Sequence, residues 1–371
     1  MLNTIGLASM WYLAAVYPFP PWYLKTVNKL IFPYIWGEGK PEFIKRQTLY
    51  LPKDQGGIAI YHPLHRSLAL RTKTITQITN LNNDLKWCYI ARYYIGYQLA
   101  ALKPEWHALR SNSRPYHDSL RTPMYYTDVL NFVKTLPLDS VEFNTRFLYE
   151  SYYKLQPYEP TAVKNWPKLR SLPYQWTNIW PLVYDSHAIG RHQEIHYKFL
   201  HLAFPTRDMR KKWTAQKNMN PHCQYCRRIS SFQMENHLHA FFSCPLAYNV
   251  WAKIKPILQM MFLKDPISTL RITLGLFPPN IKYSIRKLAV SLIQITLYRV
   301  WLNYNLYAFE SVIHDETGSV HWIKRTFKTL IRTRFNAFKR TNSLAKFRQE
   351  YCNTTKLLSI GDRETLVIAF T

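Results

Sequence analysis

The chain has 371 residues, and its 49 lysines and arginines exceed its 22 aspartates and glutamates, which gives a formal net charge of +27. This balance excludes an acidic or neutral fold, and 47% hydrophobic residues supply enough apolar side chains for buried cores. Because glycine is scarce at 10 residues and proline plentiful at 23, we expect a mostly α-helical protein with prolines at its connections.

The high net charge predicts a polyanionic partner, because positive charge on one compact body repels itself unless a partner neutralises it. The chain also has 27 tyrosines, 12 tryptophans and 19 phenylalanines, whose rings can stack on bases while lysine and arginine bind phosphates. We therefore expect a nucleic-acid partner rather than a membrane, where an amphipathic helix would concentrate these residues on one stripe. The alternative is a cationic surface without a specific partner.

The first 60 residues predict two packed helices and a short β-hairpin-like element. Apolar spacing predicts helices over residues 2–16 and 22–36, with a proline-rich turn between them. Residues 43–60 contain two short extended runs before Pro52, and a pair of glycines then turns the chain into a third apolar run.

The rest of the chain divides into three parts. Residues 61–185 contain segments with helical spacing but no catalytic or ligand-binding motif, so we expect a helical linker region there. Prolines and aromatic residues between 166 and 181 indicate an irregular connection, which places a boundary near 186. Residues 186–255 contain a metal-ligand spacing, and residues 256–371 predict a C-terminal basic helical region.

Cysteine usage indicates a reducing compartment. The five cysteines lie at positions 88, 223, 226, 244 and 352, an odd number whose clustering differs from a secreted disulfide framework. The uncharged stretch at 5–24 has no basic region before it and is interrupted by prolines, so we expect neither a signal peptide nor a membrane span. We expect an intracellular protein of the nucleus, the cytoplasm or both.

The strongest motif is a set of metal-ligand residues with the spacing C-x2-C-x12-H-x4-C. Cys223 and Cys226 can direct both sulfurs to one ion from a tight turn, and His239 and Cys244 would complete a tetrahedron. Three thiolates and one imidazole favour Zn2+ over calcium or magnesium, which prefer oxygen ligands, and over iron–sulfur clusters, which usually take four thiolates. Four protein ligands leave no position for a catalytic water, so we expect a structural ion.

The identity of the histidine ligand stays open at this point. His239 has a recurrent spacing to Cys244, whereas His237 lies two residues earlier, on roughly the other side of a helix. His222 is too close to Cys223 to close the ring easily. A metal-free alternative is a group of reduced cysteines in an intracellular core, with the histidines at the surface.

An enzymatic alternative combines His192 and Glu194 with the Cys-x2-Cys pair. This order is similar to the H-x-E and P-C-x-x-C pattern of zinc deaminases, in which one histidine and two cysteines hold an ion that activates water while the glutamate transfers protons. The match departs at His222, which is inserted between the proline and the first cysteine, and it leaves the later histidine and cysteine without a role.

Two clusters of cations mark candidate nucleic-acid contacts. Residues 186–253 hold ten lysines and arginines against three acids. The candidates in this region are Arg207, Arg210, Lys211, Lys212, Trp213, Arg227 and Arg228. A bound ion could hold these cations and neighbouring rings on one rigid face, which favours single-stranded or structured RNA, or an RNA–DNA hybrid, as the partner.

The second cluster has nine cations within residues 324–348 and no acid among residues 317–349. Its candidates are Lys324, Arg325, Lys328 and Arg332. Three of them repeat at i, i+4 and i+8, which makes one face of a predicted helix cationic, while Ile323 and Phe327 begin an apolar stripe on the neighbouring face. The alternative is a solvated face of a packed helix.

Two segments resemble the C-terminal part of the reverse transcriptases of LINE-type, non-LTR retrotransposons. The first contains KLIFPYIW at 29–36, IKR-x-TL at 44–49 and LPK-x2-GGI at 51–58, and it looks like the end of the polymerase thumb. The second contains FPTRD at 204–208 and FF-x-CP-x-A-x3-W at 241–251, and it is similar to the reverse-transcriptase zinc-binding domain.

The resemblance implies that residues 1–60 are a thumb-like remnant with its connection, and that residues 186–255 are the zinc-binding domain. In an intact element such a region would help to retain template RNA near the polymerase portion, which becomes a candidate partner. The x12 gap between Cys226 and His239 is longer than the family often shows, which also leaves the identity of the histidine open.

The polymerase chemistry of that family is missing from this chain. The family needs carboxylates in an aromatic-x-Asp-Asp context to hold two divalent ions, and this sequence contains no Asp-Asp pair. Its nearest segment, Tyr125 to Asp128, lacks the second acid, and we expect Asp128 to be a surface residue beside packed tyrosines. We therefore expect a non-enzymatic, RNA-binding region of a truncated element; the alternative is a relic or protein-interaction module without a nucleic-acid role.

Overall fold

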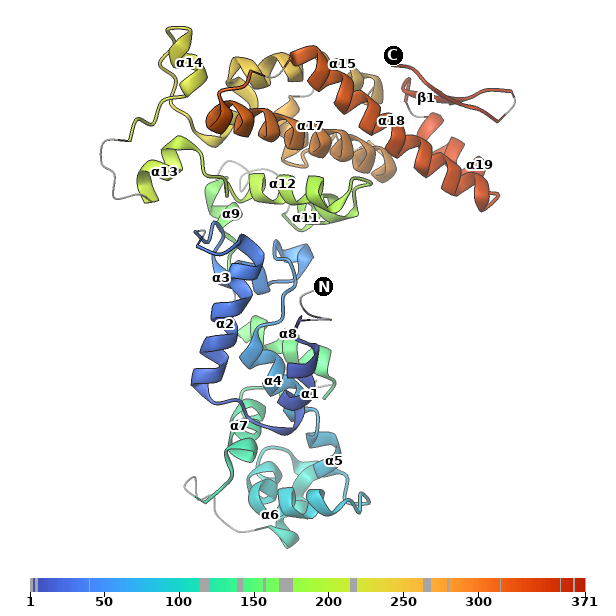
Figure 1. Cartoon of the computed structure of the whole chain (residues 1–371). Helices are drawn as coiled ribbons and strands as arrows, with labels where there is room; N and C mark the ends of the chain where they lie inside the picture. The colour runs from blue at the N-terminus through green and yellow to red at the C-terminus, as the bar shows by residue number, and fades with distance from the viewer. Residues whose placement is uncertain are drawn as a thin grey trace. The chain divides into compact units, whose positions relative to one another are not determined.

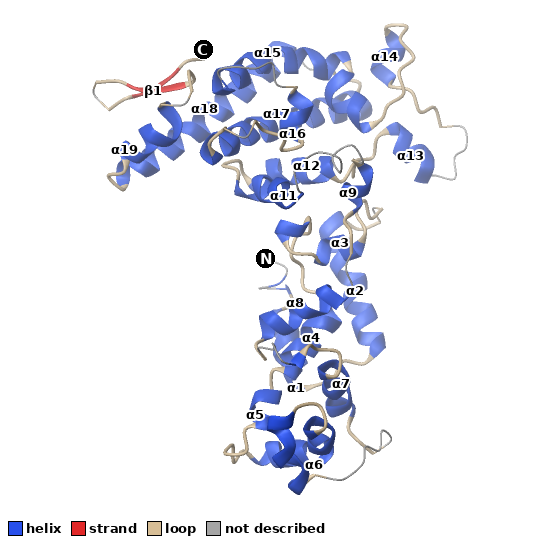
Figure 2. Cartoon of the chain, turned by 180° about the vertical axis from the view of Figure 1, so that it is seen from behind, coloured by secondary structure: helices blue, strands red, loops and turns tan. Residues whose placement is uncertain are grey.

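The computed structural model is mostly helical, as the composition predicts, and it forms two compact units (Figure 2). The N-terminal unit comprises Met1–Pro52 and Gly57–Glu159, and the C-terminal unit comprises Lys53–Gly56 and Pro160–Thr371. The structure describes residues 3, 6–39, 41–113, 121–138, 143–155, 158–166, 176–213, 219–262, 268–278, 280–313, 315–353, 355–362 and 364–370. The expected four-part organisation, with boundaries after residues 60, 185 and 255, stays a prediction.

The N-terminal unit is built from short helices (Figure 1). Three of them, α2, α4 and η3, begin at a proline (Pro21, Pro63 and Pro104), where a missing N–H costs no hydrogen bond. The helices are α1 (Ala8–Val16), α2 (Pro21–Trp36), α3 (Arg46–Tyr50), α4 (Pro63–Thr72), α5 (Ile75–Thr79), α6 (Lys86–Ala100), η3 (Pro104–Asn112), α7 (Met124–Val133) and α8 (Thr145–Leu155). Buried side chains such as Ile95 and Val129 pack α5, α6, η3 and α7 into one core cluster.

The prediction of a hairpin-like element near residues 43–60 is wrong. The chain forms α3 there, and the N–H groups of Ile58 and Ile60 both donate to the carbonyl of Leu49, each at 3.3 Å. Two donors that share one carbonyl do not make the ladder of an antiparallel strand pair. The prediction failed because a short apolar run fits a turn of helix as well as a strand.

Asp128, the acid in the segment compared with the polymerase motif, lies on α7 and pairs with Arg71 of α4. Its Oδ2 atom is 2.9 Å from Nη1 of Arg71, whose side chain is 1% exposed. The guanidinium group of Arg71 also lies over the Tyr125 ring. Asp128 is about one-third exposed, so it lies near the surface as expected, and it also neutralises the charge of a buried arginine.

The C-terminal unit carries the longer helices. Its elements are η2 (Lys53–Gln55), α9 (Thr161–Asn165), α11 (Trp176–Asp185), α12 (Gly190–Leu200), α13 (Arg207–Trp213), α14 (Gln224–Arg228), η5 (His239–Ser243), α15 (Pro245–Phe262), α16 (Thr269–Thr273), α17 (Tyr283–Glu310), α18 (Glu316–Arg340), α19 (Leu344–Phe347), η6 (Arg348–Cys352), β1 (Leu358–Ile360) and β2 (Leu366–Ile368). The start of α18 is fixed by Asp315, whose carboxylate accepts hydrogen bonds from the N–H groups of Thr317 and Gly318.

Helix α17 is the centre of the C-terminal unit. Ten consecutive residues, 288–297, are buried, which means that the helix is covered on every side over almost three turns. Helices α12, α15 and α18 pack against it (Figure 1). The buried polar residue Gln294 is satisfied within this packing: its amide donates to the Val183 carbonyl at 2.9 Å, and its oxygen accepts from the Ser186 hydroxyl at 2.6 Å.

The two strands of the described residues lie near the C-terminus rather than near residues 43–60. Strands β1 and β2 pair in antiparallel register, with Leu358 opposite Ile368. The ring of Phe370, just after β2, stacks on Phe327 of α18, which attaches this hairpin to the core. None of the described helices combines the length and the apolar run that crossing a lipid bilayer requires.

Candidate metal centre

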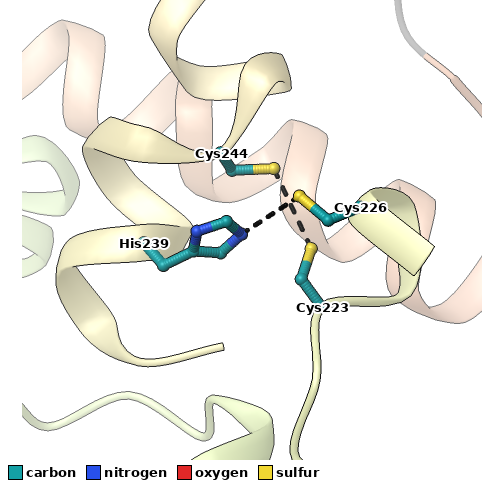
Figure 3. A group of neighbouring side chains, drawn as sticks. All are labelled: Cys223, Cys226, His239 and Cys244. Carbon is teal, nitrogen blue, oxygen red and sulfur yellow. Dashed lines mark hydrogen bonds between the residues drawn. The ribbon is translucent and has the colours of Figure 1, made fainter. Parts of the chain in front are cut away.

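Three cysteines and one histidine converge in the C-terminal unit (Figure 3). The four ligand atoms of Cys223, Cys226, His239 and Cys244 lie within 4.8 Å of one another, and all four residues are buried. The sulfurs of Cys223 and Cys244 are 3.9 Å apart, and Nε2 of His239 is 3.4 Å from the sulfur of Cys226. Ligands at the vertices of a tetrahedron around Zn2+ would lie roughly 3.3–3.8 Å apart, so the group is close to the dimensions of such a site.

The first two ligands are placed by a tight turn that opens α14. Cys223 is the residue before this helix, and Cys226 is its third residue. An antiparallel bridge between His222 and Met234 joins the two sides of the loop, and the N–H of Cys223 donates to the Gln233 carbonyl at 2.8 Å. These main-chain bonds fix the backbone around the two cysteines, whose sulfurs lie within 4.8 Å of each other.

The other two ligands come from η5 and the start of α15. The N–H of Cys244 donates to the carbonyl of His239 at 2.8 Å, which closes one turn and brings the two residues to the same side. Pro245 then begins α15 directly after Cys244, where proline is favoured. Asn236 accepts a hydrogen bond from the N–H of His239 at 2.8 Å and so fixes the start of this turn.

The structure selects His239 over His237 for this group. The Nε2 atom of His237 accepts a hydrogen bond from the N–H of Phe204 at 3.2 Å, and burial lowers the pKa of His237 to about 4. His237 is therefore a neutral core residue. His222 is also outside the group, since its Nδ1 atom lies 2.8 Å from the side-chain oxygen of Asn220.

Ser243 orients the imidazole of His239. Its hydroxyl lies 3.4 Å from Nδ1 of His239, the ring nitrogen that faces away from the sulfurs. A histidine that binds a metal commonly uses its second nitrogen in this way, because the outer hydrogen bond fixes the tautomer and the plane of the ring. The motif spacing did not identify Ser243 or Asn236, since neither is a ligand.

Deprotonation of all three cysteines is unfavourable when no cation is bound. Hydrogen bonding from Cys244 lowers the pKa of Cys223 to about 4, whereas burial raises the pKa of Cys226 to about 11. The hydrogen bond with Cys223, together with burial, raises the pKa of Cys244 as well. The protein alone thus favours one thiolate, and a divalent cation is the group that would stabilise the other two.

A buried carboxylate, Glu235, joins the ligand loop to neighbouring helices. Its side chain accepts hydrogen bonds from the hydroxyl of Tyr304 on α17 and from the N–H of Arg207, the latter at 3.0 Å. Burial raises the pKa of Glu235. We did not predict this residue, because nothing in the sequence distinguishes a buried carboxylate from the surface acid expected in a polar loop.

Arg207, a predicted nucleic-acid contact, makes polar contacts within the loop. Its guanidinium group donates to the side-chain oxygen of Gln224 at 2.9 Å and to the Asn220 carbonyl at 3.4 Å, and it lies 3.8 Å from the carboxylate of Glu235. Its side chain is 21% exposed. The geometry therefore ties Arg207 to the fold of the metal-ligand loop.

The other cations near the centre differ in their surroundings. Lys211, Arg227 and Arg228 are exposed, and Arg228 lies over the Tyr307 ring. Lys212 is exposed but pairs with Asp208 on the same helix at 3.0 Å.

Arg210 is half-buried and lies over the Phe309 ring. The side chain of Trp213, the remaining candidate, lies outside the described residues.

Helix α18 presents its cations beside a buried stripe, as its periodicity predicts. The stripe contains Val320, Ile323, Phe327, Ile331 and Phe335. The four candidate contacts lie along a neighbouring face, where Arg325 and Arg332 are exposed and Lys324 and Lys328 are half-buried; together they line a hollow of about 590 Å³.

The residues of the deaminase alternative do not join the metal centre. His192 packs against the rings of Tyr298 and Trp322, and Glu194 pairs with Lys198 on the surface of α12. With His239 and Cys244 in the group, four protein atoms surround the centre, which is the arrangement of a structural site.

No protein-family model matches the chain, and no curated protein matches it.

Proposed function

We propose that this chain is a non-catalytic, RNA-binding region whose C-terminal unit is organised by a structural Zn2+. The observation that carries the proposal is the convergence of Cys223, Cys226, His239 and Cys244 within 4.8 Å. The sequence resemblance to the C-terminal part of LINE-type reverse transcriptases supports the same assignment. In that setting the region would hold template RNA beside the polymerase portion of an intact element.

Zinc is the ion that best fits the donor set. Thiolate and imidazole ligands exclude the oxygen-seeking ions calcium and magnesium, and a mixed set of three sulfurs and one nitrogen is a common structural zinc set. When bound, the ion would cross-link a loop to two helical elements, and it would have no catalytic role.

The charge distribution supports RNA as the partner. The formal net charge is +27, and α18 carries Lys324, Arg325, Lys328 and Arg332 on one side with no acid between residues 317 and 349. Arg227 and Arg228 extend cationic surface to the loop that holds the ligands. Phosphate binding by such residues releases counterions, so the interaction should depend steeply on salt.

Two measurements test the proposal. The purified chain should contain one zinc per molecule by elemental analysis, and it should bind unstructured RNA in a filter assay. If about six cations contact the phosphates of a single strand, the affinity should fall roughly three-hundredfold between 50 and 200 mM salt. Zinc with no RNA binding, or with an affinity independent of salt, would favour the alternative of a relic or protein-interaction module.

A further inference from the structure

A groove of about 690 Å³ lies in the C-terminal unit, apart from the residues of the metal centre. One wall is α18. The opposite side is formed by Ser186, His187 and Ile189 and by His192 near the start of α12, and Ile295 of α17 also lines the groove. The volume is within the range of roughly 300–1,000 Å³ that small-molecule sites occupy. The groove is therefore large enough for one nucleotide.

The α18 wall combines an aromatic ring, hydroxyl groups and two arginines. Trp322, Thr326, Thr329 and Thr333 recur at three- and four-residue spacing, so they share one face of the helix. Arg325 and Arg334 also line the groove. They are nine residues apart, which places them about 13 Å apart along the axis and at opposite edges of this face.

The groove is also lined by a buried histidine. His192 is 3% exposed, and its ring lies edge-on to the indole of Trp322, with the ring centroids 6.2 Å apart. Burial lowers the pKa of His192 to about 4, so the ring is neutral and adds no positive charge to this wall. A ligand against this wall therefore meets two uncharged aromatic rings.

The indole of Trp322 is held in place from within the fold. The ring of Tyr298 stacks on it at 6.1 Å, and the guanidinium group of Arg299 lies 5.6 Å from its centroid. Arg334 is held as well, since its guanidinium group lies 5.4 Å from the centroid of the Phe338 ring. An aromatic ring and a cation that are positioned in advance lose little side-chain entropy when a ligand binds.

The lining favours an anion with a flat heterocycle. None of the described residues that line the groove is acidic, and two arginines stand at its edges. A lipid headgroup would not need the aromatic ring, and an acidic peptide would not need a buried neutral imidazole. A nucleotide uses all three features, because its base packs against the indole and the neutral imidazole while its phosphate binds the arginines.

We infer that this groove binds one unpaired nucleotide of an RNA strand, with its base beside Trp322 and His192 and its phosphate at Arg325 or Arg334. The inference rests on the proposed RNA-binding function and adds to it a site that recognises a base as well as a phosphate. The strand would continue along the cationic face of α18, since Arg325 lines both the groove and the neighbouring hollow.

The test compares RNA that has bases with RNA that lacks them. A fluorescently labelled 12-nucleotide oligouridine is titrated with the full chain at 50 mM salt, and so is a strand of the same length with abasic riboses. We expect the abasic strand to bind the wild-type chain roughly tenfold more weakly, because a stacked base contributes to affinity while the phosphates are unchanged. Trp322→Leu should bind both strands equally, and Trp322→Phe should restore most of the difference.

A charge-matched pair of variants separates the groove from general electrostatics. Arg325→Gln and Arg340→Gln each remove one cation from α18, but Arg340, at the end of the helix, does not line the groove. We expect Arg325→Gln to weaken the binding of both strands more than Arg340→Gln does, because Arg325 lines the groove where the phosphate of the bound nucleotide would lie, and equal losses in the two variants would count against the groove. Circular dichroism confirms that each variant is folded.

The possible outcomes are distinct. A wild-type chain that binds neither strand at low salt overturns the proposed function and this inference together. Salt-dependent binding with equal affinity for the two strands overturns only the inference. Free uridine monophosphate serves as the second ligand: tight binding of the mononucleotide, abolished by Trp322→Leu while oligouridine binding is unchanged, would assign the groove to a free nucleotide and overturn the RNA assignment.

Discussion

The buried carboxylate of Glu235 accepts a hydrogen bond from the hydroxyl of Tyr304, and this contact joins the metal-ligand loop to the central helix α17. The N–H of Arg207 donates to the same carboxylate oxygen at 3.0 Å, so one side chain connects the loop to two helices. The loop is therefore fixed on two sides, by the cluster of ligands and by a polar contact that needs no ion.

Removal of the Tyr304 hydroxyl should destabilise the fold. Tyr304→Phe leaves the buried carboxylate with one donor fewer, which we expect to lower the free energy of unfolding by about 1–3 kcal/mol in urea titrations. Tyr307→Phe is the matched control on the same helix, because the Tyr307 hydroxyl is buried without a hydrogen-bond partner among the described residues. Equal losses in the two variants would contradict a specific role for the contact.

The raised pKa of Glu235 predicts a pH dependence of stability. Burial favours the protonated carboxyl in the folded state, so the stabilising contribution of this residue is complete below its unfolded pKa and is lost as pH rises through the folded pKa. Glu235→Gln should remove this loss. The free energy of unfolding of the variant relative to wild type should therefore increase from pH 4 towards pH 7, and a constant difference would contradict the prediction.

The choice between the two histidines predicts opposite effects on metal content. His239→Ala removes a ligand atom and should reduce bound zinc well below one ion per chain after dialysis, as measured by elemental analysis. His237→Ala should keep the ion, although the loss of its bond to Phe204 should lower stability by about 1–3 kcal/mol. Loss of zinc from His237→Ala alone would reverse the assignment.

The return of the chain after α3 depends on a glycine. A Cβ atom at Gly57 would lie 1.9 Å from the carbonyl oxygen of Leu51, which is backbone and cannot rotate away. We expect Gly57→Ala to lower the free energy of unfolding by about 1–3 kcal/mol. The control is Gly190→Ala at the start of α12, where a Cβ would meet no atom within 4 Å and where the change should stay within about 0.5 kcal/mol.

The sequence predicted the features that depend on composition and spacing. Its proline and glycine content indicated helices, and C-x2-C with a later histidine and cysteine gave four residues that the fold brings together. The cationic stripe of α18 also followed from periodicity, because the buried residues of one helix face recur at three- and four-residue intervals.

Features that depend on contacts distant in the sequence could not be predicted. The role of His237 is set by the N–H of Phe204, 33 residues earlier, and the role of Arg207 is set by Gln224 and Glu235. The short apolar run at residues 48–51 was wrongly predicted to be a strand for a similar reason. Such a run fits either a helix or a strand, and its hydrogen-bond partners decide between the two. The groove beside α18 was also invisible, since its opposite wall comes from residues more than a hundred positions away.

The position of Cys244 immediately before α15 affects how the centre would interact with a polyanion. A divalent ion with three thiolates and a neutral imidazole has a net charge of −1, which would repel a phosphate strand. The N-terminus of α15 contributes roughly half a positive charge next to one of those sulfurs, and Arg227 and Arg228 follow the Cys-x2-Cys turn. The fold would thus offset the negative charge of such a bound ion and its thiolates, which the proposed RNA-binding function requires of the surface around it.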